Sequence, residues 1–297
     1  MQLSTAIKLF IDRYQSPATR DSYKWPLRHF ENYMGSTRPL ADITPIDVER
    51  WNIQLINEPG RNNTTINKYR QSVKTLLNYY VKLEVLESNP AKILRINRRV
   101  KPVPRTKAMP DDLLMTLITY TSFKKRKRDV ALVCFLADTG ARIGEAENLL
   151  TAKIDFKNRK AWVSGKTGGR YVPLFDQSVK WLKEWLAQQG GQSPYTFSTT
   201  DKKQTQLDQE FRRACKAAGI GSWGPHSLRH RKGFQHSDIG NPPQLAQQQF
   251  GHSDVKMTLD HYYPHDWDRV VDAAAKLALP SDSDDNSDIL KPDFREA

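Results

Sequence analysis

Apolar residues recur every three or four positions through the first ninety residues of the chain. Residues 3–14 and 23–34 both follow this spacing, which places their apolar side chains on one face of a helix. Pro26 lies inside the second stretch and lacks a backbone hydrogen-bond donor, so the sequence predicts a kink or a late helix start there.

Two more helices are predicted before residue 91. Residues 44–47 (TPID) provide a hydroxyl cap, a proline at the first helical position and an acid three residues after the cap. Residues 66–80 carry a long apolar stripe, and the opposite face is basic. That face holds Lys68, Arg70 and Lys74, which are candidate DNA contacts. Residues 1–91 therefore predict a helical DNA-binding domain of four helices.

After residue 108 the pattern combines two periods. Helical spacing covers residues 111–120, 130–150, 177–188, 206–218 and, with breaks at 240–243 and 251, the stretch from 226 to about 279. The period falls to two in residues 153–156, 161–164 and 170–174, which predicts a three-stranded antiparallel meander. The expected fold class is mainly α with a small antiparallel β-sheet, and residues 108–279 form its second domain.

Basic residues concentrate between the two predicted domains. Residues 92–107 hold seven basic residues, two prolines and no acid, which predicts an extended basic linker. This linker is either a solvated hinge or a strap along DNA phosphates. Its candidate DNA contacts are Arg98, Arg99, Lys101 and Arg105.

The net charge points to a polyanionic partner. The chain carries +13, and residues 280–297 form an acidic tail that is predicted to be disordered, so the preceding residues carry +17. Nucleic acid is the first partner to consider for such a surplus. The basic run at residues 124–128 is open to three interpretations: a nuclear targeting signal, a phosphate-binding patch or a helix-flanking surface.

Composition excludes several classes of protein. With 38% hydrophobic and 10% aromatic residues, the chain of 297 residues is globular rather than disordered. No apolar run approaches the roughly 18 residues of a membrane span, and the N-terminus has no signal-peptide pattern. Cys134 and Cys215 are too few for a disulfide framework or a zinc site of their own. We therefore expect a cytoplasmic, DNA-associated protein.

Two candidate sites for other chemistry are weak. Six of the seven histidines lie between residues 226 and 265, but only His226 and His230 form a ligand-like helical pair, and no glutamate lies beside them as in HExxH. Residues 165–167 (GKT) lack the glycine that a nucleotide-binding loop requires five positions earlier. We expect no metal and no cofactor.

Two arginines are better placed for phosphate chemistry. On a helix that begins near residue 226, His226 and Arg229 share one face. Arg142 follows a predicted turn into another helix, with Glu145 one turn later. Two guanidinium groups that converge on one phosphate would bind its oxygens with planar forks of donors and stabilise the charge that develops in phosphoryl transfer.

These motifs occur in the order of a known family. They are residues 139–145 (TGARIGE), 165–174 (GKTGGRYVPL), 226–230 (HSLRH), 251–254 (GHSD) and 258–262 (TLDHY). In this order and spacing they resemble the tyrosine recombinases, the family of phage integrase, Xer and Cre, over about residues 3–275. The resemblance implies a helical, SAM-like core-binding domain followed by an α+β catalytic domain.

The resemblance also implies roles for single residues. The catalytic set falls on Arg142, Lys166, His226, Arg229, His252 and the nucleophile Tyr262. Glu145 is expected to orient Arg142. Tyr263 is the fallback nucleophile because it directly follows Tyr262, and Phe250 replaces the leucine that relatives commonly carry before the Gly-His pair.

The implied function is that of a site-specific DNA recombinase, or integrase. Members of the family cut and rejoin strands through a 3′-phosphotyrosyl intermediate without metal or ATP. The implied partners are a double-stranded recombination site, a homotetramer on two duplexes and accessory DNA-bending factors. Residues 272–279 could dock into a neighbouring subunit or pack on their own domain. Two alternatives remain: a non-catalytic DNA-binding regulator on the same fold and a type IB topoisomerase-like enzyme.

Overall fold

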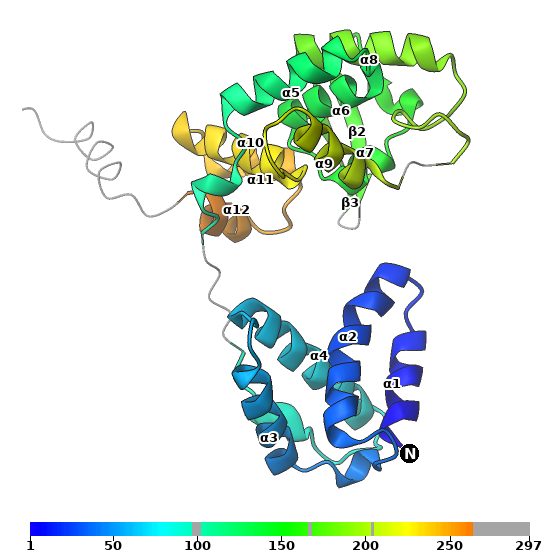
Figure 1. Ribbon diagram of the computed structural model, residues 1–297, viewed down its shortest axis with the longest axis vertical. Coiled ribbons are helices and arrows are strands. Elements are labelled where there is room, and N and C mark those ends of the chain that lie inside the picture. The colour runs from blue at the N-terminus through cyan, green and yellow to red at the C-terminus, as the bar shows by residue number, and fades with distance from the viewer. Residues whose placement is uncertain (97–101, 166–167, 203–204, 264–297) are drawn as a thin grey trace, which may run out of the picture. The chain divides into compact units, whose positions relative to one another are not determined.

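The chain folds into two compact units, Met1–Arg99 and Val100–Ala297. The computed structural model describes residues 1–96, 102–165, 168–202 and 205–263. Each unit has a hydrophobic core of its own. Both units are mainly helical, and the second also contains the small sheet (Figure 1).

Unit 1 contains the four helices that the sequence predicts. They are α1 (Leu3–Asp12), α2 (Pro17–Met34), α3 (Pro45–Asn57) and α4 (Asn63–Lys82), with short 3-10 turns η1 (Leu40–Asp42) and η2 (Pro90–Ile93). Their apolar faces meet in a core in which Phe10, Phe30 and Trp51 are fully buried. The predicted start of α3 is confirmed, because Thr44 and Asp47 cap each other: the Asp47 N–H donates to Thr44 Oγ1 at 3.3 Å, and the Thr44 N–H donates to Asp47 Oδ2 at 2.9 Å.

Of the two alternatives predicted at Pro26, a kink or a late helix start, the late start is wrong. The helix begins at Pro17, in the first turn, where a missing N–H costs nothing because that group has no partner within the helix. It continues through Pro26, whose ring is buried. A proline inside a helix costs about 3 kcal/mol, and the contacts of this helix with the core offset that cost.

The first residues of the predicted linker pack into unit 1. Residues 90–93 form η2, and Leu94 is buried in the core of this unit. Lys74 Nζ donates to the Leu94 carbonyl at 2.9 Å, and Arg70 Nη1 donates to the Arg95 carbonyl at 3.1 Å. These bonds hold residues 92–95 against α4, so the first residues of the predicted linker belong to unit 1.

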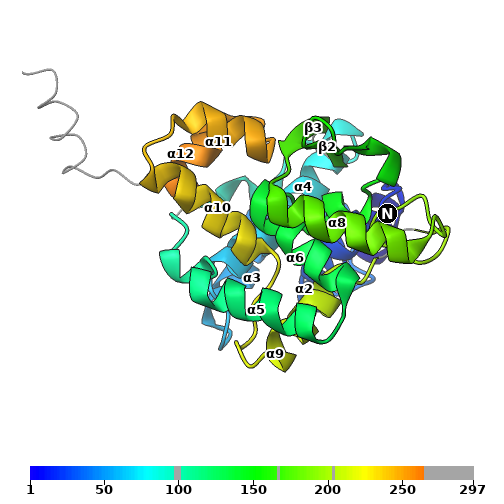
Figure 2. The same cartoon turned by 90° about the horizontal axis from the view of Figure 1, so that it is seen from above.

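Unit 2 packs around a central helix, Lys127–Thr139, most of whose residues are buried. Its helices are α5 (Asp111–Phe123), α6 (Lys127–Thr139), α7 (Ile143–Glu147), α8 (Asp176–Gln189), α9 (Leu207–Ala217), α10 (His226–Asp238), α11 (Pro243–Phe250) and α12 (Val255–Tyr262), with 3-10 turns η3 (Arg105–Lys107) and η4 (Thr151–Lys153). Helix α6 lies between α5 and α8, while α11 and α12 lie side by side next to α10 (Figure 2). No helix in the described ranges is both long enough and apolar enough to cross a membrane.

The predicted meander is confirmed. Strands β1 (Ile154–Asp155), β2 (Lys160–Gly165) and β3 (Gly168–Pro173) pair antiparallel in the order β1-β2-β3. Gly165 pairs with Gly168 at the tip of the β2-β3 hairpin. Between these two glycines lie residues 166–167, so the predicted catalytic Lys166 is outside the described residues.

Candidate active site

A cleft of about 890 Å³ opens beside helix α7. Its lining residues are Arg142, Ile143, Gly144, Glu145, Asn148, Ser164, Gly165 and His226. The cleft therefore joins the start of α7, the end of β2 and the start of α10. These segments contain three of the motifs that the sequence analysis identified.

Arg142 is held at the cleft by a buried carboxylate. Glu145 is only 2% exposed, and its oxygens accept hydrogen bonds from the Arg142 N–H at 2.8 Å and from Arg142 Nη1 at 3.2 Å. Arg170 of β3 donates to the same two oxygens at 2.8 and 2.9 Å. Burial opposes ionisation of this carboxyl, but the hydrogen bonds and charges of Arg170 and Arg142 outweigh it and hold the pKa of Glu145 below its usual value.

Arg229 is buried, at 2% exposure, on α10, the helix whose first residue, His226, lines the cleft. Its Nη1 donates to the Gly140 carbonyl at 2.7 Å, and its Nη2 donates to the Phe250 carbonyl at 2.9 Å. Burial and the nearby Arg142 lower the pKa of Arg229 to about 10, so the guanidinium remains charged near neutral pH. The structure thus brings the two predicted arginines close enough for the charge of Arg142 to affect the pKa of Arg229.

The Phe250 ring packs against the guanidinium group of Arg229. The guanidinium carbon lies 4.7 Å from the centre of the Phe250 ring, which is fully buried. The same ring occupies the space beside Gly140, which has φ +62°, and a Cβ at that glycine would lie 2.6 Å from the ring. The larger side chain in place of the common leucine therefore fills a contact between α6, α10 and α11.

His252 is a hydrogen-bond acceptor in this state. Arginine can only donate, so the 2.9 Å contact between Arg229 Nη2 and His252 Nε2 fixes Nε2 as the acceptor. The proton then lies on Nδ1, which donates to Thr258 Oγ1 at 2.8 Å. Burial and the charges of Arg229 and Arg142 lower the pKa of His252 to about 3. The ring is therefore neutral and oriented by two partners.

Tyr262 packs onto helix α10. It is 3% exposed, and its ring lies against Phe234 and Phe250 at centroid distances of 5.5 and 5.8 Å. A Cβ at Gly233 would lie 2.6 Å from the Tyr262 ring, so only glycine allows this close approach. Burial raises the pKa of Tyr262, while the charges of Arg229 and Arg142 act to lower it. The hydroxyl lies 3.1 Å from His230 Nδ1.

Tyr263 faces a different environment. Its hydroxyl donates to the Asn241 carbonyl at 2.9 Å, whereas the Tyr262 hydroxyl lies against His230. Helix α12 ends at Tyr262, and Tyr263 is its C-terminal cap. The geometry therefore favours Tyr262 over Tyr263 as the residue that could reach a phosphate bound by Arg142 and Arg229.

His226 lies at the wall of the cleft, one helical turn before His230. Its ring faces the cleft, but the protein packed around it and the charges of Arg229 and Arg142 lower its pKa. The two histidine rings lie 5.1 Å apart. In the part of the chain that the structure describes, no three side chains of His, Cys, Asp or Glu gather as metal ligands.

Sequence reasoning missed Arg170 and His230. Arg170 belongs to the motif at residues 165–174, but its pairing with Glu145 joins β3 to α7 across 25 residues and has no local signal in the sequence. His230 belongs to the HSLRH motif, but the sequence assigns it no role beyond that of a possible metal ligand. Its position four residues after His226 does place it on the same helix face, and the missing information was the location of Tyr262.

The residues predicted to contact DNA differ in whether their side chains are already bonded within the protein. Lys68 is exposed on α4. Arg70 and Lys74 hydrogen-bond the backbone of residues 92–95, as described above, and Arg105 Nη1 donates to Asp238 Oδ2 at 3.0 Å. Arg98, Arg99 and Lys101 lie outside the described residues, as do the acidic tail and residues 272–279.

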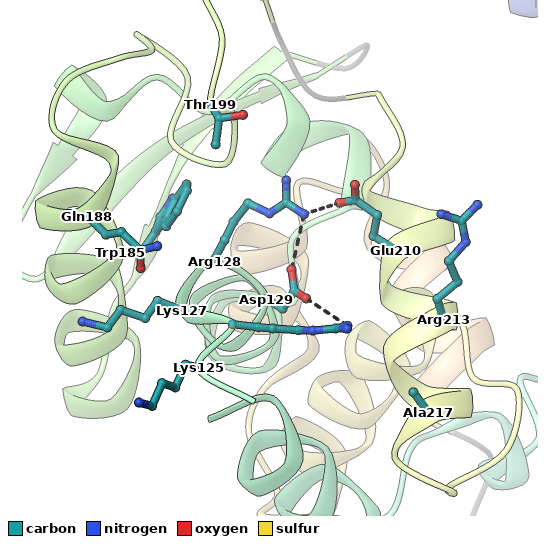
Figure 3. A pocket seen from close by; sticks show the side chains of 11 residues that line it. Lys125, Lys127, Arg128, Asp129, Trp185, Gln188, Thr199, Glu210, Arg213 and Ala217 are labelled. Atoms are coloured by element: carbon teal, nitrogen blue, oxygen red, sulfur yellow. Dashed lines mark hydrogen bonds and ion pairs between the residues drawn. The ribbon is translucent and has the colours of Figure 1, made fainter. Parts of the chain in front are cut away.

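A second cavity, of about 580 Å³, lies at the junction of α5 and α6, where the basic run 124–128 is located. Arg128 Nη2 lies 2.8 Å from Glu210 Oε2 and 3.4 Å from Asp129 Oδ1 (Figure 3). Lys127 pairs with Glu184 at 3.5 Å. These ion pairs connect α6 with α8 and α9, which fits the interpretation of the run as a helix-flanking surface.

Comparison with known proteins identifies the family. Residues 106–269 match the Phage integrase family, and residues 6–84 match the Phage integrase N-terminal SAM-like domain. The chain is 24% identical over 271 residues to the tyrosine recombinase XerC of Lacticaseibacillus casei, covering 84% of this chain and 89% of the relative. It is 23% identical over 276 residues to the transposase from transposon Tn916 of Enterococcus faecalis, covering 81% and 68%.

Solved structures share the fold. The Tn1549 transposon integrase in complex with transposon right-end DNA matches with a TM-score of 0.77 and 19% identity, over 94% of this chain and all of that one. The XerH site-specific recombinase bound to difH substrate matches with a TM-score of 0.72 and 21% identity, over 93% and 85%. The two-unit fold and the match over residues 106–269 show that the chain belongs to the phage integrase family of tyrosine-type site-specific recombinases.

Proposed function

We propose that this recombinase breaks and rejoins DNA strands through a covalent link to Tyr262. The observation that carries the proposal is the convergence of a tyrosine, two arginines and two histidines from four separate segments. Arg142 and His226 line the cleft, and both arginines act on the pKa of the buried Tyr262. His252 hydrogen-bonds Arg229 directly.

The charges suit a phosphodiester. Arg142 has the more exposed guanidinium, with about a third of its side chain accessible, and would bind the non-bridging oxygens first. Arg229 supplies a second, buried positive charge whose effect is strengthened by the low local dielectric. Together they would stabilise the extra negative charge of the transition state.

The reaction balances without an external reagent. The Tyr262 oxygen attacks phosphorus, an O–P bond forms, and the bond to the 5′ oxygen breaks. The tyrosine proton is lost, with His226 as the candidate base, and Lys166 is the candidate donor of a proton to the 5′ oxygen. A 5′ hydroxyl of a second strand then attacks the phosphotyrosine and restores the phosphodiester. The covalent link conserves the bond energy between the two steps.

Lys166 is proposed from its neighbours in the chain. Ser164 and Gly165, which directly precede it in β2, line the same cleft as Arg142 and His226. A lysine beside two arginines is expected to have a lowered pKa, which would help it to give up a proton.

The proposed partner is a double-stranded recombination site. The Tn1549 integrase and XerH structures are described as complexes with their own DNA. For this chain we propose a homotetramer on two duplexes, assisted by DNA-bending factors, acting in the cytoplasm. Of the predicted DNA contacts on α4, Lys68 is the best candidate for a phosphate contact, because it is exposed while Arg70 and Lys74 bond the backbone of residues 92–95.

Covalent trapping tests the proposal. Binding sites are first selected from a random-sequence duplex library. The chain is then incubated with a duplex that carries a nick close to the cleavage site, so that the short fragment with the new 5′ hydroxyl diffuses away after cleavage. We expect a denaturant-resistant protein–DNA adduct that is absent in Tyr262→Phe and retained in Tyr263→Phe. An adduct lost only in Tyr263→Phe would move the nucleophile by one residue.

The same substrates separate the alternatives. Tight binding without any adduct would indicate the non-catalytic regulator. Relaxation of supercoiled DNA without joined products from two duplexes would indicate the topoisomerase-like enzyme. Joined products containing strands of both duplexes are expected.

A further inference from the structure

His230 is the polar contact of the candidate nucleophile. Its Nδ1 lies 3.1 Å from the Tyr262 hydroxyl, and among the described residues no other side chain hydrogen-bonds that hydroxyl. The contact connects α10 to the last residue of α12. It places a ring nitrogen directly against the oxygen that would attack phosphorus.

The environment keeps this histidine neutral. Burial lowers the pKa of His230 to about 4, and positive or titratable groups on three elements act in the same direction: His226 and Arg229 on α10, Lys107 on η3 and His261 on α12. A neutral imidazole has one N–H and one free lone pair. With the N–H on Nε2, Nδ1 is free to accept the hydrogen bond of the phenol.

In the described part of the chain, the other contacts of the tyrosine ring are mainly apolar, and the His261 ring lies 6.0 Å away between centroids. Gly233 allows the ring to touch the α10 backbone, and Phe234 and Phe250 lie against it. Such contacts fix the ring plane but do not determine where the O–H bond points. The direction of that bond matters because the attacking lone pair and the departing proton must be arranged around the same oxygen.

We propose that His230 positions the Tyr262 hydroxyl for attack by accepting its hydrogen bond. This inference rests on the proposed function, in which Tyr262 is the nucleophile. The phenol has a single proton, so the bond to His230 orients the hydroxyl before attack, and the proton passes to His226, the candidate base at the wall of the cleft, when the hydroxyl turns from Nδ1 toward the bound phosphate. His230 is therefore a positioning residue in this account. An apolar packing role for His230 would require only a side chain of similar volume, so the two roles predict different results for polar and apolar replacements.

The test compares, in the full chain, two replacements that have the same number and branching of side-chain heavy atoms; of the two, Leu is closer to His in volume. His230→Asn places an amide oxygen close to the position of Nδ1 and can accept the hydrogen bond, whereas His230→Leu cannot. We expect the Leu variant to form the covalent adduct at least about 10-fold more slowly in single-turnover reactions on the nicked duplex, a loss of about 1.4 kcal/mol. The Asn variant should recover most of the wild-type rate.

Control measurements assign every outcome. DNA affinity and unfolding midpoint should agree between the Leu and Asn variants. The inference is overturned if the Leu variant reacts at the wild-type rate, if both variants are slowed equally, or if the Leu variant reacts faster, which would mean that the bond holds the tyrosine back. If the wild-type chain itself forms no adduct, the proposed function fails first.

Discussion

Replacing Glu145 with glutamine should destabilise the chain strongly. The carboxylate is 2% exposed and accepts bonds from Arg142 and Arg170, whose side chains are 34% and 11% exposed. Removing one partner of a buried ion pair leaves an uncompensated charge and costs about 3–5 kcal/mol. The partial exposure of Arg142 places the expected loss near the lower end of that range.

Equilibrium urea unfolding of the full chain measures this loss. Asp208→Asn is the matched control, because it also removes a carboxylate that bonds an arginine, but both side chains of that pair are more than 40% exposed. Exposed pairs contribute about 0–1 kcal/mol. Equal losses in the two variants would refute the claim that the Glu145 network is a buried one.

The pH dependence of the same difference has a defined sign. The folded-state pKa of Glu145 is lowered, so its contribution is fully present above the unfolded value of about 4.3 and is lost as the pH falls through the folded value. The difference in unfolding free energy between the wild type and Glu145→Gln should therefore be largest near pH 7 and should decrease as the pH falls into the acid range. A gap that grows as the pH falls would contradict the assignment.

Three further predictions concern other parts of the chain. Gly233→Ala should slow adduct formation at least about 10-fold, because the added methyl group would lie 2.6 Å from the Tyr262 ring. Alanine favours the helix by about 1 kcal/mol relative to glycine, so a loss of helix propensity cannot explain the slower rate. A wild-type rate would contradict the close approach. His252→Gln should flatten the fall in unfolding free energy between pH of about 6.5 and 3, since the pKa of His252 is lowered to about 3, and an unchanged slope would count against its burial as a neutral ring. Lys68→Ala should reduce the slope of log affinity against log salt by about 0.9, and an unchanged slope would remove it from the DNA contacts.

Local patterns were sufficient for most of the fold. The helical periods, the capping residues around Thr44 and the alternation before and after the β2-β3 turn each depend on residues within a few positions of one another. The late helix start expected at Pro26 is wrong because α2 begins at Pro17, after Ser16. Pro26 inside the helix is tolerated because the helix packs against residues that are distant in the sequence.

The candidate site was predictable in its residues but not in its contacts. Motif spacing predicts Arg142 at the entry to a helix and His226 and Arg229 on one helix, where the structure has them. The bonds of Glu145 to Arg170, of Arg229 to the Gly140 carbonyl and of His230 to Tyr262 span 25 to 89 residues. Such pairings depend on how the helices pack against one another, and they cannot be predicted from the periodicity of the sequence.

Identifying the residue that becomes linked to DNA tests the central claim most directly. Trypsin cuts after Lys256 and Arg269, so a single peptide carries both adjacent tyrosines. After trapping on the nicked duplex and nuclease digestion, fragmentation of this peptide by mass spectrometry locates the nucleotide. The account predicts a 3′-nucleotide on Tyr262. A nucleotide on Tyr263, or on any other residue, would contradict it.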